Sequence, residues 1–133
     1  MPDFAKVSHL SFSARDAERS ASWYQEVLGV EVLDRVAGEG WHSVLLIHPP
    51  SAAIIEFQQH DANGGETFDP RRTGLDHLGL LVSTRAELER WRDHFERLGV
   101  VHSPIADRDY GSVLCFRDPD GIQLEMFYRQ GHP

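Results

Sequence analysis

The chain has 133 residues, of which 41% are hydrophobic and 26% charged, as expected of a globular protein with enough chain for a core, in one compact domain or in two very small ones packed together. Its formal net charge of −8 argues against nucleic acids and anionic membranes as partners, because both attract basic surfaces. No apolar run approaches the roughly 20 residues of a membrane span, no signal peptide is apparent, and the single cysteine, Cys115, excludes an internal disulfide. We therefore expect a cytoplasmic protein.

The first half of the chain predicts a strand, a helix and three further strands. Leu10 and Phe12 alternate with polar residues, which indicates a strand over residues 4–13. Asp16 can cap a helix that ends at Gly29, a residue suited to the left-handed conformation at a helix end. Three short β-like runs separated by turns follow, over Val30–Val36, Trp41–His48 and Ala52–Gln58.

The second half repeats this order after a polar stretch, residues 59–73, that predicts a surface loop or linker. Thr84 and Glu87 form a capping box at the start of a helix that Gly99 closes. The residues expected on its buried side are Leu88, Trp91, Phe95 and Leu98. The expected strands are Asp76–Val82, Val100–His102, Ser112–Arg117 and Ile122–Tyr128.

A carboxylate stands in the middle of the last expected strand. The turn residues of 118–121 (Asp-Pro-Asp-Gly) precede this strand, and alternation puts Leu124 and Met126 on one face and Gln123, Glu125 and Phe127 on the other. Burying a carboxylate among apolar neighbours costs free energy unless a positive group compensates it. Glu125 therefore predicts a cationic partner.

The two halves repeat with one offset. His9 and His77 are 68 positions apart, Glu56 and Glu125 are 69 apart, and Leu28-Gly29-Val30 recurs 70 positions later. One offset thus relates the opening histidine, the end of the helix and the closing glutamate of each half. We interpret this as an internal duplication of a β-α-β-β-β unit.

The duplication indicates a metal site. Each half has a histidine in its first strand and a glutamate in its last, on the face opposite the residues that pack under the helix. Two imidazoles and two carboxylates that converge are suitable ligands for Zn²⁺, Ni²⁺, Co²⁺, Mn²⁺ or Fe²⁺. The expected ligands are His9, Glu56, His77 and Glu125.

Simpler interpretations exist for each residue alone. A single strand histidine is more often exposed or hydrogen-bonded, and a single glutamate is more often solvated or paired with an arginine such as Arg129. Cys115 alternates with apolar residues and is expected in the core rather than as a nucleophile. The histidines that do not repeat are expected on the surface or in loops: His42, His48, His60, His94, His102 and His132.

Several stretches resemble the vicinal oxygen chelate superfamily, which includes glyoxalase I, bleomycin-resistance proteins and extradiol dioxygenases. The matching stretches are Val7–Leu10, Ser22–Gly29, Ile54–Phe57, Gly74–Leu78 and Phe116–Glu125. The resemblance implies an α+β fold of two tandem βαβββ modules that form a curved mixed sheet around a metal cleft. It spans the whole chain as one domain, 1–133, with module 1 at about 4–60, a linker at about 61–73 and module 2 at about 74–130.

The ligand pattern is most similar to that of bacterial glyoxalase I, whose four ligand positions fall on the same two histidines and two glutamates. Two positions depart from that family: Ser13 stands where it has an arginine for the glutathione carboxylate, and His60 stands where it has an asparagine. These departures argue against glutathione hemithioacetal as the substrate and leave another thiol adduct or a different α-hydroxycarbonyl compound as alternatives. The resemblance also leaves two alternatives, an extradiol-type dioxygenase and a protein that sequesters an aromatic metabolite or antibiotic.

We expect a divalent-metal-dependent enzyme of the glyoxalase I-like type, a lyase or isomerase, with one ion per site. The metal would polarise two substrate oxygens and stabilise an enediolate while a carboxylate moves a proton between adjacent carbons. Glu125 is expected as the base, because Met126 and Phe127 give it drier neighbours in sequence than those of Glu56, the steadier ligand. The expected substrate pocket is lined by Ser11, Ser13, Ile54, Gln58, Leu81, Gln123 and Phe127.

A homodimer is expected, because four-stranded half-sheets leave exposed edges and a partly apolar face. The resemblance implies that modules pair either within one chain or across two chains.

Overall fold

The computed structural model describes residues 1–131 and divides into two compact units, residues 1–66 and the chain from Thr67 onward. Each unit has one helix and one four-stranded mixed sheet, so the predicted α+β fold of two βαβββ modules is confirmed. The boundary between the units falls inside the polar stretch 59–73. His132, expected on the surface or in a loop, lies outside the described residues.

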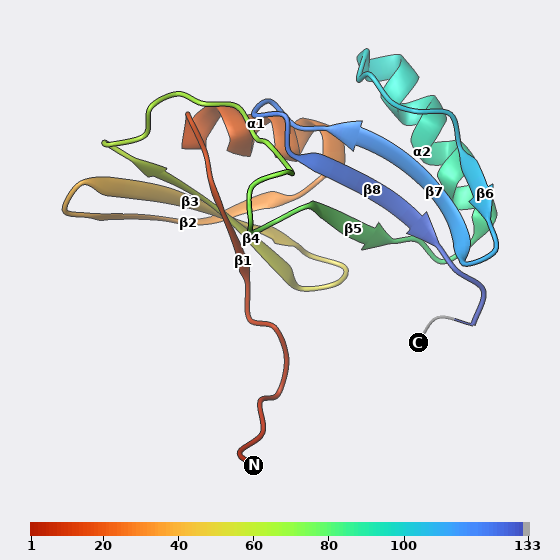
Figure 1. Cartoon of the computed structure of the whole chain (residues 1–133), viewed down its shortest axis with the longest axis horizontal. Coiled ribbons are helices and arrows are strands. Elements are labelled where there is room, and N and C mark those ends of the chain that lie inside the picture. Colours follow the sequence, from red (N-terminus) through yellow and green to blue (C-terminus); the bar gives the residue numbers. More distant parts are fainter. Residues whose placement is uncertain (132–133) are drawn as a thin grey trace. The chain divides into compact units, whose positions relative to one another are not determined.

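The first module has its strands in the order β1-β4-β3-β2. Its elements are β1 (Leu10–Ser13), α1 (Ala17–Leu28), β2 (Glu31–Gly38), β3 (Trp41–His48) and β4 (Ala53–His60). β1 runs parallel to β4, and the other neighbours are antiparallel. α1 packs against β3 and β4 (Figure 1).

The second module has the same strand order, β5-β8-β7-β6. Its elements are β5 (His77–Leu81), α2 (Arg85–Leu98), β6 (Ala106–Arg108), β7 (Gly111–Arg117) and β8 (Gln123–Tyr128). β5 runs parallel to β8, and β7 is antiparallel to both β6 and β8. α2 packs against β7 and β8 (Figure 1).

Local capping interactions determine where both helices begin and end, as predicted. The side chain of Asp16 accepts a hydrogen bond from the backbone N–H of Arg19, and Thr84 accepts one from Glu87. Gly29 and Gly99 adopt φ values of 68° and 69°, a left-handed conformation that residues with a Cβ rarely adopt.

Aromatic contacts between helix and sheet form the core of each module. In the first module the rings of Tyr24 and Phe57 lie 4.5 Å apart, and both residues are 0% exposed. In the second, the rings of Phe95 and Phe116 lie 4.4 Å apart. Truncating such a ring to alanine costs about 3–5 kcal/mol, so these contacts fix each helix on its sheet.

Strand register supports the internal duplication. In the first module Ser11 of β1 pairs with Glu56 of β4, and in the second Gly79 of β5 pairs with Glu125 of β8. Each glutamate therefore occupies the same position beside the first strand of its module. The repeat seen in the sequence is a repeat of backbone register, which local composition alone does not require.

Three expectations about the elements were wrong. β1 begins at Leu10 rather than at residue 4, so His9 precedes the strand. The strand expected at 100–102 lies instead at Ala106–Arg108; His102 makes only an isolated bridge with Phe116, and Pro104, which lacks an N–H, interrupts the ladder. Leu98, expected on the buried side of the helix, is 39% exposed, and the buried residues of α2 are Leu88 and Phe95.

Across residues 1–131, neither helix is both long and apolar enough to cross a membrane.

Candidate functional site

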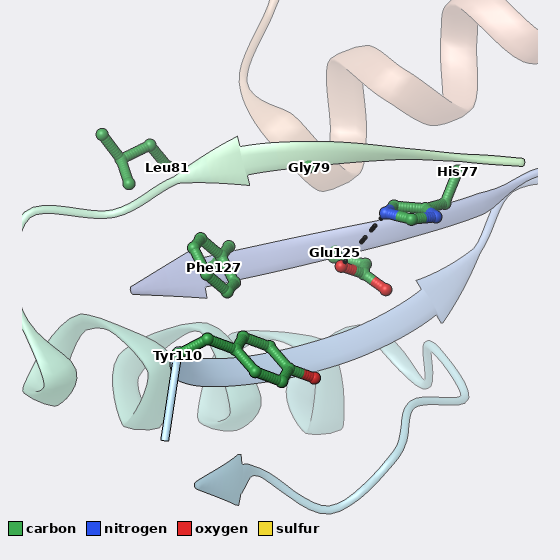
Figure 2. Close-up of a pocket in the computed structure, with 6 residues that line it drawn as sticks. All are labelled: His77, Gly79, Leu81, Tyr110, Glu125 and Phe127. Carbon is green, nitrogen blue, oxygen red and sulfur yellow. Dashed lines mark ion pairs between the residues drawn. The ribbon is translucent and has the colours of Figure 1, made fainter. Parts of the chain in front are cut away.

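Two neighbouring parallel strands of the second module bring His77 and Glu125 together. His77 opens β5 and Glu125 lies in the middle of β8, where its backbone pairs with Gly79. His77 Nε2 lies 3.7 Å from Glu125 Oε2, and the two side chains are 44% and 17% exposed. Figure 2 shows the imidazole and the carboxylate pointing toward each other. This pair supplies one nitrogen and one oxygen donor at a single point, and the imidazole of His77 is the side chain that Glu125 Oε2 faces.

Asp76 orients the imidazole of His77. Asp76 Oδ1 lies 2.6 Å from His77 Nδ1, so the other ring nitrogen, Nε2, faces Glu125. The hydrogen bond to Asp76 raises the pKa of His77, with Glu125 adding to the effect and desolvation opposing it. A carboxylate that holds the far nitrogen of a histidine is the usual outer partner of a metal-binding imidazole.

The other oxygen of Glu125 accepts two hydrogen bonds. Gln123 Nε2 lies 3.1 Å from Glu125 Oε1, and Cys115 Sγ lies 3.6 Å from the same oxygen. Cys115 was expected in the core, and this was wrong: it pairs with Glu125 across β7 and β8, on the face opposite buried Leu114 and Phe116. Burial, followed by the negative charge of Glu125, raises the pKa of the Cys115 thiol.

An open pocket of about 470 Å³ lies beside this pair, and all of its lining residues belong to the second module. They are His77, Gly79, Leu81, Tyr110, Glu125 and Phe127. One end carries the polar pair; the other carries apolar side chains, with the rings of Tyr110 and Phe127 stacked at 6.4 Å (Figure 2). Gly79 leaves the strand face open between the two ends, since nothing lies within 4 Å of where its Cβ would be.

Tyr110 was missed in the sequence, and it is 57% exposed. It lies in the loop of the β6–β7 hairpin. This hairpin was not predicted from the sequence, because the preceding strand was expected at 100–102. Gly111 seats the tip of this hairpin closely on β8: its φ is 149°, and a Cβ there would lie 2.4 Å from the carbonyl oxygen of Tyr128. The polar run 107–109 (Asp-Arg-Asp) followed by Tyr110-Gly111, just before an apolar strand, was the available turn signal.

Of the three pocket residues predicted in the second module, two line the pocket and one contacts Glu125 instead. Leu81 and Phe127 line the pocket, whereas Gln123 holds the carboxylate of Glu125. Arg117 in turn donates to the carbonyl oxygen of Gly121 at 2.7 Å and to Gln123 Oε1 at 3.4 Å.

In the first module the corresponding residues lie on β1, on β4 and just before β1. Glu56 is half-buried in β4 beside exposed Ser11, whereas His9 is exposed before β1 with its Nδ1 3.2 Å from Ser8 Oγ. The other predicted pocket residues are exposed Ser13, half-buried Ile54 and half-buried Gln58, whose Nε2 lies 3.2 Å from His60 Nε2.

Neither module alone completes a metal site. Within residues 1–66 and within residues 67–131, no three His, Cys, Asp or Glu side chains gather to hold an ion. The His77–Glu125 pair nevertheless has the donor types and the oriented imidazole that suit a first-row divalent metal, so it fits a partial site.

Comparison with known families places the chain in a superfamily. The model of the Glyoxalase/Bleomycin resistance protein/Dioxygenase superfamily matches residues 6–126. The chain belongs to this superfamily. Among solved structures, a glyoxylase/bleomycin resistance protein/dioxygenase domain from Frankia sp. EAN1pec is 31% identical, with a TM-score of 0.88 over 96% of this chain and 100% of that one.

Two curated members of the superfamily are similar in sequence. Metapyrocatechase from Geobacillus stearothermophilus is 25% identical over 95% of this chain, and the putative ring-cleaving dioxygenase MhqA from Bacillus subtilis is 28% identical over 83%. The matched segments make up 35% of each of these proteins, so the chain spans about a third of their length.

The fosfomycin resistance protein FosX from Listeria monocytogenes shares the fold at 15% identity, with a TM-score of 0.71 over 97% of each chain. A glutamate-to-glutamine variant of that protein was solved as a complex with Mn(II) and 1S,2S-dihydroxypropylphosphonic acid. A protein that shares this fold thus binds a divalent metal and a small vicinal diol.

Proposed function

We propose that this chain is a divalent-metal-dependent enzyme that acts on a small substrate with two neighbouring oxygens. The observation that carries the proposal is the orientation of the His77–Glu125 pair: Asp76 holds Nδ1, so Nε2 faces the carboxylate at the polar end of a pocket. Holding the far nitrogen in this way prepares the imidazole to bind a cation. A structural histidine–glutamate pair would not need an open pocket beside it.

His9 and Glu56 occupy the repeat-related positions of the first module, and we propose them as the remaining ligands, supplied by the same chain or by a second one. Two imidazoles and two carboxylates suit one Ni²⁺, Zn²⁺, Co²⁺, Mn²⁺ or Fe²⁺ ion. When bound, such an ion acts as a Lewis acid on substrate oxygens.

The reaction that best suits these residues is a proton transfer of the glyoxalase I type. Glu125 lies at the polar end of the pocket, where a carboxylate can take a proton from one carbon and return it to the next. Leu81, Tyr110 and Phe127 hold the apolar part of the substrate and exclude water from that end. Glu56 serves as the second carboxylate.

Ring cleavage is a second candidate function, because one of the two curated relatives, MhqA, is named as a putative ring-cleaving dioxygenase. Two histidines and one carboxylate with open positions suit non-haem iron chemistry, and the stacked rings of Tyr110 and Phe127 suit a flat substrate. A protein that only binds an aromatic metabolite is the third candidate, and it would not need the four ligands.

Metal analysis of protein purified without chelators separates the binder from the enzymes. About one divalent ion per chain supports an enzyme, whereas metal-free protein that binds an aromatic compound tightly supports the binder. Turnover assays then compare α-hydroxycarbonyl compounds and thiol hemithioacetals, under Ni²⁺ or Zn²⁺, with catechols under Fe²⁺ and oxygen. Isomerisation in the first set supports the glyoxalase type, and oxygen consumption with catechols alone would replace it by ring cleavage.

We also propose that the protein acts as a homodimer. β2 is the edge strand of the first sheet, and on it Leu33 is 49% exposed and Val36 is 41% exposed. A second chain that covered this edge would remove apolar surface from water. Sedimentation equilibrium at micromolar concentration should give twice the chain mass, and Leu33→Glu/Val36→Lys should shift it toward the monomer. A monomer in the unmodified protein would contradict the proposal.

A further inference from the structure

We infer that Gln123 and Cys115 are positioning residues that hold Glu125 by one oxygen, Oε1, and so leave Oε2 as the oxygen presented to metal or substrate. The inference rests on the proposed function, because it concerns the same site. It adds two residues to which neither the superfamily match nor the ligand pattern gives a role.

The two oxygens of Glu125 have different surroundings. Oε1 accepts from Gln123 Nε2 at 3.1 Å and from Cys115 Sγ at 3.6 Å, whereas Oε2 lies 3.7 Å from His77 Nε2. Both donors come from the sheet itself: Cys115 pairs with Glu125 across the strands, and Gln123 is two residues earlier on the same strand face. Both side-chain hydrogen bonds to the carboxylate therefore go to Oε1, while Oε2 faces the imidazole of His77.

Arg117 fixes the orientation of the Gln123 amide. Its Nη2 donates to Gln123 Oε1 at 3.4 Å, and its Nη1 donates to the carbonyl oxygen of Gly121 at 2.7 Å. A flipped amide would place its NH₂ against the guanidinium and its oxygen against a carboxylate, and both contacts are repulsive. The turn before β8 thus orients the carboxylate through two side chains.

The first module lacks this arrangement. Leu45 pairs with Glu56 as Cys115 pairs with Glu125, and Ile54 stands two residues before Glu56 as Gln123 does before Glu125. Neither leucine nor isoleucine can donate a hydrogen bond from its side chain. The duplicated carboxylates are therefore not equivalent: only the one in the second module has side-chain donors at these two positions. The residues directly before and after each glutamate in the strand point to the opposite face of the sheet, so they do not cause this difference between Glu125 and Glu56.

The test compares the divalent-metal affinity of four variants with that of the unmodified protein, measured by competition with a chromophoric chelator. Each variant must first show the same cooperative thermal unfolding as the unmodified protein. Gln123→Leu/Cys115→Ala gives Glu125 the apolar surroundings of Glu56 and should weaken affinity about 10- to 100-fold, the usual effect of removing outer-sphere partners. Cys115→Ala alone should weaken it less. Cys115→Ser keeps a donor and should remain close to the unmodified protein. Gln25→Leu, on the exposed face of α1, is the matched control for losing a glutamine and should change nothing.

An unchanged affinity in the double variant would overturn the inference while leaving the proposed function intact. A thiolate-to-metal charge-transfer band in the Co²⁺-loaded protein that Cys115→Ser abolishes would also overturn it, by making the cysteine a ligand. If the unmodified protein binds no metal, the proposed function fails and NMR of metal-free protein decides the inference. Glu125→Gln should then shift the side-chain amide signals of Gln123, whereas Glu56→Gln should not; equal or absent shifts would contradict the positioning role.

Discussion

Asp76 and His77 are neighbours in sequence whose side chains also contact each other, with Asp76 Oδ1 2.6 Å from His77 Nδ1. Because this hydrogen bond raises the pKa of His77, the protonated imidazole persists to a higher pH than usual. A protonated imidazole cannot bind a metal, so affinity should fall as the pH drops through the raised pKa.

Asp76→Asn should move this fall in metal affinity to lower pH, because it removes the largest cause of the raised pKa. At the alkaline end of the pH series, where affinity no longer changes with pH in either protein, the variant should bind metal about 10-fold more weakly, since the imidazole is less well oriented. Affinities measured from pH 5 to 8.5 check both effects. An identical pH midpoint in the two proteins would contradict the role of Asp76.

His77→Ala should remove most of the bound metal, because one of two proposed nitrogen donors is lost. His48→Ala is the matched control: His48 lies at the end of β3, where its Nδ1 is 2.7 Å from Ser51 Oγ, outside the proposed ligand set. Elemental analysis of both variants measures the difference. Full metal content in His9→Ala/His77→Ala would refute the ligand assignment.

With metal in excess, Glu125→Gln should still be loaded with metal while kcat falls about 100-fold or more, because an amide retains the shape of the carboxylate but cannot accept the proton. Glu56→Gln should change metal affinity more than kcat. Steady-state kinetics and metal titration with the same substrate separate the two effects. Near-normal turnover in Glu125→Gln would exclude it as the base.

Asp107 should stabilise the second module in a pH-dependent way. Arg85 of α2 and Ser112 of β7 both hydrogen-bond its carboxylate and lower its pKa from 3.8 to about 2. A lowered pKa means that the ionised group favours the folded state. Its contribution is complete above about pH 4 and disappears as the pH falls toward 2.

Asp107→Asn should therefore lower the free energy of unfolding at pH 6, and the difference from the unmodified protein should shrink below pH 4. The effect should be small and reduced by salt, since the side chain of Asp107 is 63% exposed. Asp109→Asn, an exposed carboxylate in the same hairpin, is the control. Urea unfolding at several pH values measures the difference, and a gap that does not vary with pH would contradict the assignment.

Much of the fold could be predicted from the sequence because its signals are local. Asp16 and Thr84 cap their helices through backbone groups three residues away, and Gly29 and Gly99 end them through their own φ angles. Alternation likewise placed Leu124 and Met126 in the core and Glu125 on the opposite face. The duplication then selected His9 and His77 out of eight histidines in the chain, and paired Glu56 with Glu125.

The sequence could not indicate which side chains meet across strands. Alternation gives the face of Cys115 and Glu125, but their pairing depends on the register of β7 against β8, which the intervening turn and the packing of both strands determine. The same holds for Tyr110, which reaches the pocket because the β6–β7 hairpin ends beside Phe127. Sequence thus determined the modules and their repeated donors, and tertiary structure decided the neighbours of each donor, because cross-strand contacts join residues with no local relation in the chain.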